Sequence, residues 1–166
     1  MRVLVAGVGN VLRGDDGFGV EVARRLAAMS LPSGVRVVET GIGGIALVQE
    51  LQEGWDALVI VDTVDRGRPS GTILVIEPDV VDVDALSWAE RHDLLADMHL
   101  ATPERALMLA RALGVLPAVV RLVGCQPCDA ERYGLGLDPV VAQAVDVAIQ
   151  QVLDEVEDLT GLRAGG

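Results

Sequence analysis

The chain opens with a nearly unbroken aliphatic run from Arg2 to Val8, which ends in Gly-Val-Gly-Asn. Such a run is typical of a strand buried on both faces of a sheet, and the glycines after it predict a tight turn. A helix with one apolar face is predicted from Asp16 to Met29. Strands buried on both faces belong to parallel sheets covered by helices, so the N-terminal segment predicts an α/β fold.

The alternation of strand and helix continues along the chain. Further strands are predicted at 35–40, 57–62, 71–77 and 118–124, and further helices after the glycines at 41–44, at 102–114 and from 138 onward. The link between the third and fourth strands is too short for a parallel crossover, so an antiparallel pairing is predicted at that point and the sheet is predicted to be mixed. We therefore predict one domain over residues 1–166, an α/β three-layer sandwich. Its five-stranded twisted sheet is mostly parallel, with one antiparallel strand and helices on both faces.

One segment has little periodicity. Residues Pro78 to Leu100 are acidic, and they are predicted to form a long loop with a short helix around Ala85 to Arg91. Loops of this length are often functional.

Composition excludes several classes of protein. Apolar residues make up 51% of the chain, which excludes disorder, while aromatic residues make up only 2%. The net charge is -12 and all 13 cations are arginine, which argues against binding to a nucleic-acid backbone. A chain without lysine also has neither a P-loop nor a Schiff-base lysine.

The two cysteines, Cys125 and Cys128, form a single C-x-x-C. They are too few for a disulfide framework, and they serve either as a redox or metal-binding pair or as structural residues in a turn. The N-terminus has no signal-peptide pattern, and no apolar stretch is long enough for a membrane span. We expect a cytoplasmic protein.

Three polar residues are predicted to converge at one edge of the sheet. Asp16 and Asp62 each follow a central strand, where open α/β sheets bind their ligands, and His99 comes three residues before the helix cap at Thr102. Two carboxylates and an imidazole suit a divalent ion such as nickel or zinc, with positions open for water or substrate. Each residue also has a structural interpretation, since the aspartates are good capping residues and His99 resembles the surface residue His92.

The same N-terminal segment also permits a dinucleotide-binding interpretation. Gly7 to Gly9 follow a strand, and Glu39 ends the next strand, where a ribose-binding acid would lie. However, Leu12 stands where the third glycine is required. The acidic residues Asp15 and Asp16 would also repel a pyrophosphate.

The run from Gly7 to Gly19, G-x-G-N-x-L-x-x-D-D-G-x-G, resembles the N-terminal signature of the hydrogenase maturation endopeptidases. The similarity continues through Asp62, through His99 and through the Gly-Leu-Gly-Leu segment at 134–137. Members of this family remove the C-terminal extension from the large-subunit precursor of nickel-iron hydrogenases. The resemblance therefore implies an endopeptidase whose partner is that precursor.

The resemblance also implies how the substrate is recognised. In the family, nickel already seated in the precursor is recognised through an acidic residue, an aspartate and a histidine. In this sequence those positions are Asp16, Asp62 and His99, which would be both metal-binding and catalytic. Nickel is expected to arrive with the substrate, where it would order the scissile peptide and act as a Lewis acid. In the alternative, Asp16 or Asp62 acts as the general base that activates the attacking water.

The substrate cleft is expected to be framed by a few turn residues. These are Asn10, which is the only asparagine of the chain, and Gly41, Ile42, Gly43 and Gly44. Ile42 departs from the family pattern, in which a threonine is expected, so the sequence does not identify the hydrogenase that is processed.

We therefore expect a monomeric endopeptidase, a hydrolase of the metal-dependent or aspartate type. Two alternatives stay open. One is a non-catalytic nickel-binding protein that escorts the precursor, and the other is a nucleotide-binding regulator on a Rossmann-like sheet.

Overall fold

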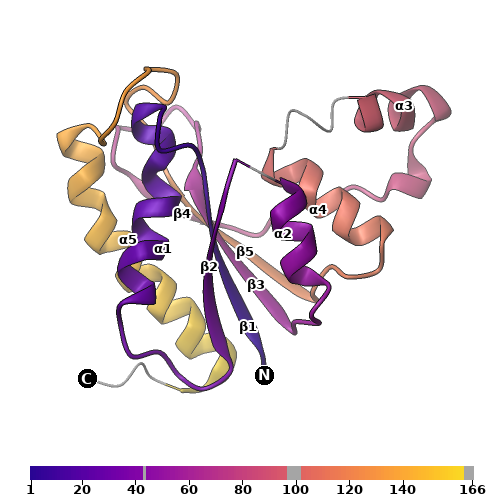
Figure 1. Cartoon of the computed structure of the whole chain (residues 1–166), viewed down its shortest axis with the longest axis horizontal. Helices are drawn as coiled ribbons and strands as arrows, with labels where there is room; N and C mark the ends of the chain where they lie inside the picture. Colours follow the sequence, from indigo (N-terminus) through magenta and orange to yellow (C-terminus); the bar gives the residue numbers. More distant parts are fainter. Residues whose placement is uncertain (43, 97–101, 163–166) are drawn as a thin grey trace.

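The computed structural model describes residues 1–42, 44–96 and 102–162, and its five strands form one sheet. The strands are β1 (Val3–Val8), β2 (Val35–Gly41), β3 (Ala57–Thr63), β4 (Ile73–Ile76) and β5 (Val119–Cys125). Their order is β2-β1-β3-β5-β4, with β4 antiparallel to β5 and the other neighbours parallel (Figure 1). The mostly parallel five-stranded sheet predicted from the sequence is confirmed.

The central strands β1 and β3 are buried almost throughout. Every residue of β1 is buried, and in β3 only Thr63 is partly exposed. Their β-branched and aliphatic side chains fit a sheet covered on both faces. Because the strands are parallel and in register from Val3 opposite Ala57, their carboxyl ends meet at the same edge of the sheet.

Helices cover both faces of this sheet. The helices are α1 (Phe18–Ala27), α2 (Gly44–Leu51), α3 (Trp88–Ala96), α4 (Pro103–Ala112) and α5 (Pro139–Thr160), with short 3-10 helices η1 (Gly14–Gly17) and η2 (Val83–Ala85). Figure 1 shows α1 and α5 on one face and α2 and α4 on the other. Two separate apolar clusters result, one on each face. The predicted three-layer arrangement is therefore confirmed.

The prediction that the strands joined by the short link pair with each other is wrong, because β4 pairs with β5 and not with β3. Strand β4 lies at the sheet edge beside β5, and β5 separates it from β3. The link crosses the end of β5, where the Gly71 N–H donates to the Gln126 carbonyl at 2.8 Å and the Gln126 N–H donates to Thr72 at 2.9 Å. The buried Gln126 side chain also accepts from the Arg66 N–H at 2.8 Å. Gln126 therefore fixes the crossing.

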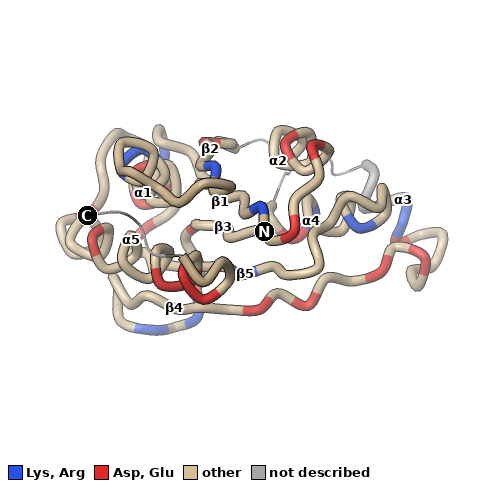
Figure 2. The backbone as a smooth tube through the Cα atoms, turned by 90° about the horizontal axis from the view of Figure 1, so that it is seen from below, with Lys and Arg blue, Asp and Glu red and all other residues tan. Residues whose placement is uncertain are grey.

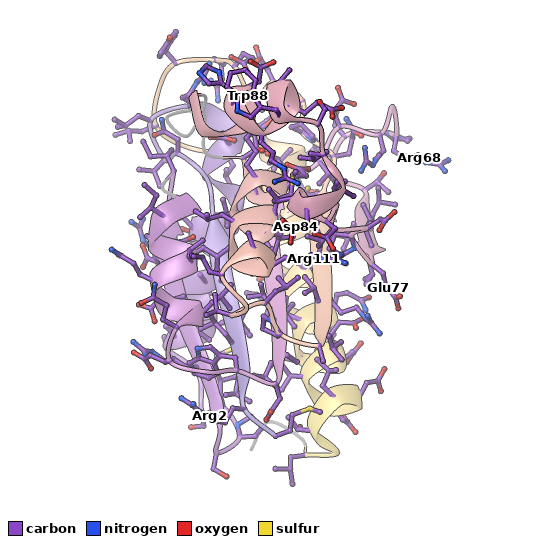
Figure 3. All side chains as sticks on the ribbon, turned by 90° about the vertical axis from the view of Figure 1, so that its right-hand side faces the viewer. Arg2, Arg68, Glu77, Asp84, Trp88 and Arg111 are labelled. Atoms are coloured by element: carbon purple, nitrogen blue, oxygen red, sulfur yellow. The ribbon has the colours of Figure 1, made fainter. Side chains whose placement is uncertain are left out.

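The segment before α4 is more ordered than predicted. The expected short helix at 85–91 is replaced by η2 and by α3, which extends to Ala96. Ser87 and Glu90 form a capping box, because the Ser87 N–H donates to the Glu90 carboxylate at 2.8 Å and the Glu90 N–H donates to Ser87 Oγ at 3.3 Å. Figure 3 shows Trp88, the first residue of α3, at the end of the molecule opposite Arg2.

Acidic residues are distributed around the fold (Figure 2), in keeping with the net charge of -12. Within residues 1–42, 44–96 and 102–162, the helices are too short or too polar to cross a membrane.

Replacement of Gly19 by alanine should destabilise the protein strongly. A Cβ on Gly19 would lie 2.1 Å from the Val61 carbonyl oxygen and 2.3 Å from the Val8 carbonyl oxygen, so α1 would have to move off the sheet. We expect Gly19→Ala to lower the free energy of unfolding by about 3 kcal/mol or more, measured by urea denaturation. Gly54→Ala is the control, since nothing lies within 4 Å of its Cβ and only its φ of 77° is unfavourable. Equal losses in the two variants would contradict the close-packing argument.

Candidate active site

The first acidic residue of the site is Asp62, near the end of β3. Its side chain is buried, with 8% of the residue exposed, and its carboxylate accepts from the Thr63 N–H at 2.7 Å. Burial raises the pKa of Asp62 to about 8, and the negative charges of Asp16 and Glu104 add to the effect, while the Thr63 N–H opposes it. Asp62 is thus a carboxyl group that can hold a proton near neutral pH.

The second is Asp16, in η1 directly after the turn that follows β1. Its carboxylate accepts from the Asn10 N–H at 2.9 Å, and the Asn10 N–H also lies 3.1 Å from the Asp16 carbonyl oxygen. Partial burial raises the pKa of Asp16, whereas the Asn10 hydrogen bond and the charge of Arg13 lower it. The two aspartates therefore have unequal environments, although their charges interact.

Asp16 and Asp62 line one cavity of about 430 Å³ at the carboxyl edge of the sheet. Its other lining residues come from the turn after β1, from the segment after β2 and from the start of α4: Val8, Gly9, Arg13, Ile42, Thr63, Thr102, Pro103 and Glu104. Three of the lining residues are acidic and one, Arg13, is basic. The cavity therefore presents carboxylates to whatever enters it.

The third predicted member, His99, lies outside the described residues. Among the residues that the structure does describe, no group of three metal-ligating side chains is assembled. The structure thus brings together Asp16 and Asp62, while their roles as metal-binding and catalytic residues stay predictions. His92 lies on α3, exposed and stacked against Trp88 with ring centroids 5.5 Å apart, as expected for a surface histidine.

Three of the five residues predicted to frame the substrate cleft line a second cavity of about 370 Å³. It contains Asn10, Gly41 and Ile42, and it shares Gly9 and Ile42 with the first cavity. Gly44 begins α2, and it is not among the lining residues of either cavity. The Asn10 side chain accepts from the Leu12 N–H at 3.0 Å and so stabilises the turn.

Gly43, the remaining residue predicted to frame the cleft, lies outside the described part of the chain. Ile42 lines both cavities and is 64% exposed, so its side chain is accessible at the place where the two cavities adjoin.

Asp15, next to Asp16, has a structural role. It is 1% exposed, and its carboxylate accepts from the backbone N–H groups of Cys128 at 2.8 Å, Asp129 at 3.1 Å and Asp138 at 2.7 Å. It therefore ties η1 to the segment that leads into α5. The prediction that an aspartate of this turn caps the helix that follows it is wrong, because neither η1 nor α1 has a side-chain hydrogen bond at its N-cap, which is Arg13 in η1 and Gly17 in α1.

Sequence reasoning missed three cavity residues. Glu104 lies in the first turn of the helix that begins near Thr102, but an acidic residue at that position is equally expected from the helix dipole and so does not by itself indicate a site. Thr63 directly follows Asp62 and could have been included with it. Arg13 had no local signal, since its orientation depends on contacts with residues more than 100 positions away.

The glycines of the first turn serve the packing of the chain itself. A Cβ on Gly9 would lie 1.8 Å from the Asp16 carbonyl oxygen, so this glycine permits η1 to approach β1. Glu39, the candidate ribose-binding acid, instead forms an ion pair with Arg24 at 3.1 Å. Both observations argue against a dinucleotide site.

The cysteine pair fits the structural interpretation. Cys125 is buried at the end of β5, and burial raises the pKa of its thiol to about 12, so it stays protonated near neutral pH. Cys128 is exposed, and its N–H group binds Asp15.

This fold and site define an α/β protein with a cavity at the carboxyl ends of its parallel strands, lined by a pair of aspartates, where open sheets of this kind bind their ligands. The model of the family HycI, hydrogenase maturation protease, matches residues 20–155. That match begins after the Gly7 to Gly19 signature, so it is independent of it. The chain belongs to the hydrogenase maturation protease family, and it is a protease, which confirms the resemblance and the predicted hydrolase.

Individual relatives agree with this assignment. The hydrogenase expression/formation protein HupD of Rhodobacter capsulatus is 38% identical over 156 residues, which are 93% of this chain and 71% of that protein. The hydrogenase maturating endopeptidase HybD from E. coli superposes with a TM-score of 0.76 at 27% identity, over 96% of this chain and 94% of that one. A hydrogenase 2 maturation peptidase from the Thaumarchaeota archaeon SCGC_AB-539-E09 superposes with a TM-score of 0.67 at 34% identity, over 94% of this chain and 98% of that one.

The buried carboxyl of Asp62 should make stability depend on pH. Its pKa is about 8 in the folded state and near 3.8 in the unfolded chain, so the unfolded chain binds fewer protons between these values. The folded state should then lose stability as pH rises from 4 to 8, with no further loss above 8. Asp62→Asn removes this loss. We expect the free energy of unfolding of the variant to exceed that of the wild type by on the order of 3 to 5 kcal/mol at pH 8, and to differ little from it at pH 4.

The measurement is urea denaturation at several pH values. Asp146→Asn is the control, because Asp146 is an exposed residue of α5 with an 81% exposed side chain. A stability difference between Asp62→Asn and the wild type that did not change with pH would contradict the assignment.

Asp15→Asn should destabilise the protein at neutral pH. An amide cannot accept all three N–H groups as the carboxylate does, and its own NH₂ would face donors. We expect a loss on the order of 2 to 3 kcal/mol in the free energy of unfolding. Hydrogen exchange should locate the change, with faster exchange at the amides of Cys128, Asp129 and Asp138. Exchange at these amides as slow as in the wild type would show that the carboxylate does not fix the segment.

Proposed function

We propose that this protease removes the C-terminal extension from the large-subunit precursor of a nickel-iron hydrogenase, after nickel has been inserted into the precursor. The relatives named above are hydrogenase maturation or formation proteins, which supports a hydrogenase precursor as the substrate. A cytoplasmic location and a monomeric state stay predictions from the sequence.

The observation that carries the proposal is the convergence of Asp16 and Asp62 in one cavity. The two residues are 46 positions apart in the sequence, and the parallel arrangement of β1 and β3 places both at the same sheet edge. Carboxylate oxygens bind divalent ions such as nickel, and His99 is the proposed third ligand on the basis of the family resemblance. Nickel is part of the substrate in this proposal, and it would order the scissile peptide and polarise its carbonyl group.

The chain's own residues have distinct proposed roles in hydrolysis. A water oxygen attacks the carbonyl carbon of the scissile peptide, and its proton passes to a carboxylate oxygen of the aspartate pair. The C–N bond then breaks, and a proton is returned to the nitrogen of the leaving fragment. The unequal environments of Asp16 and Asp62 favour such a division between proton acceptor and proton donor.

The second cavity supplies a place for the polypeptide next to the cleaved bond. Its apolar lining comes from Val11, Leu12, Val20 and Ile42, and its charged groups are Arg24 and Glu39. Because it joins the first cavity at Gly9 and Ile42, it can hold residues of an extended substrate while the scissile bond lies beside the aspartates.

The proposal predicts which single substitutions abolish cleavage. A nickel-loaded large-subunit precursor should lose one C-terminal fragment when incubated with the wild type, as measured by intact mass. Asp16→Ala, Asp62→Ala and His99→Ala should each lower the cleavage rate by about 100-fold or more, because each removes a group of the proposed reaction centre. His92→Ala is the matched control, since this histidine is exposed on α3, and it should leave the rate unchanged.

Nickel-free precursor should stay intact with every variant. A precursor that binds the wild type but is never shortened would support the escort alternative. Cleavage lost only in His92→Ala would show that the other histidine belongs to the site, and equal cleavage of nickel-free precursor would contradict recognition of the metal.

A further inference from the structure

Arg13 is the one basic residue among those that line the cavity of the two aspartates. Its side chain is 35% exposed, and it forms an ion pair with Glu131. The guanidinium carbon also lies 5.6 Å from the centroid of the Tyr133 ring, within the range of a cation–π contact. Arg13 is therefore held in place from one side by residues of the segment between β5 and α5.

That segment is firmly attached to the turn that carries Arg13. The Gly14 N–H donates to the Gly134 carbonyl at 2.9 Å, and the Gly134 N–H donates to the Leu12 carbonyl at 2.9 Å. Asp15 binds three N–H groups of the same segment. The main chain is thus fixed on both sides of residue 13, while Glu131 and Tyr133 hold the guanidinium itself, and both effects lower the entropy lost when it binds a ligand.

The guanidinium retains unused hydrogen-bonding capacity. Its Nη2 atom binds Glu131, whereas its Nε atom is buried and has no hydrogen-bond partner in the described structure. A guanidinium carries five N–H donors, and a buried donor without an acceptor costs about 1 to 3 kcal/mol. Because Nε is buried while the side chain as a whole is 35% exposed, the donors left for a ligand are those of the outer Nη atoms.

The charges of the cavity indicate what Arg13 is for. Hydrolysis of a peptide places negative charge on the carbonyl oxygen, and here that oxygen would lie among Asp16, Asp62 and Glu104. Ionised carboxylates would oppose that charge, so a preorganised cation aimed at the oxygen adds to the polarisation that nickel in the substrate would supply. Arg13 is the basic residue that lines this cavity.

We propose that Arg13 binds the carbonyl oxygen of the scissile peptide and stabilises the negative charge that forms on it. This assignment adds a catalytic residue to the aspartate pair, and it rests on the proposed function. Glu131 and Tyr133 are then positioning residues, since they act through Arg13.

The test compares Arg13→Ala and Arg13→Lys with the wild type on the nickel-loaded precursor. Removal of an oxyanion donor lowers kcat by about 100-fold or more, so we expect that loss for Arg13→Ala with little change in KM. Arg13→Lys keeps the positive charge but lacks the planar guanidinium, so its kcat should lie between those of the wild type and Arg13→Ala. Guanidinium ion at non-denaturing concentration should partly restore Arg13→Ala, whereas sodium chloride at equal ionic strength should not.

Arg25→Met is the matched control, because this arginine of α1 forms exposed ion pairs with Glu21 and Asp146 and does not line the cavity. It should cleave as the wild type does. Thermal unfolding of each variant verifies the fold, and an Arg13→Ala protein that unfolds like the wild type should still show the loss in kcat.

Three results would overturn the proposal. Full activity of Arg13→Ala would do so directly. A rise in KM alone would make Arg13 a binding residue for the ground state. A loss that disappears at another pH would show that Arg13 acts only on the pKa of Asp16. Failure of the wild type to cleave would instead refute the proposed function, so the two failures are distinguishable.

Discussion

The geometry of the site depends on the buried carboxylate of Asp15. This one side chain accepts three backbone N–H groups from a segment more than 110 residues further along the chain. Hydrogen bonds to a charged acceptor are stronger than those between neutral groups. A buried carboxylate without hydrogen-bond donors would be strongly unfavourable. The turn after β1 and the segment before α5 are therefore held together as one unit, and both the aspartate cavity and Arg13 are built on it.

Adjacent aspartates in this unit have opposite physical properties. Asp15 has its oxygens satisfied by backbone donors and is closed to solvent. Asp16 accepts one backbone N–H and faces a cavity, with its pKa raised by partial burial. One side chain thus stabilises the fold, while the next is free to contact a substrate. The sequence Asp-Asp alone does not reveal which of the two has which role.

Much of the fold follows from hydrophobic periodicity. The strands β1 and β3 are predictable because they are buried on both faces, and the edge at which Asp62 lies follows from the parallel arrangement. The partner of β4 is not predictable, since it depends on Gln126, which fixes the crossing over β5. The start of α3 could have been found from the Ser-x-x-Glu capping box at 87–90. Arg13 could not, because its orientation comes from the distant residues Glu131 and Tyr133.

The cavity is a poor place for an anionic group and a costly place for an ionised Asp62. Burial holds the pKa of that carboxyl at about 8, and two further carboxylates line the same space with a single arginine. A divalent cation that arrives with the substrate would offset both the burial of charge and the repulsion between carboxylates. A precursor without the ion would meet a cavity that repels its carbonyl oxygens. The electrostatics of the site therefore support the proposal that cleavage waits until the precursor carries nickel.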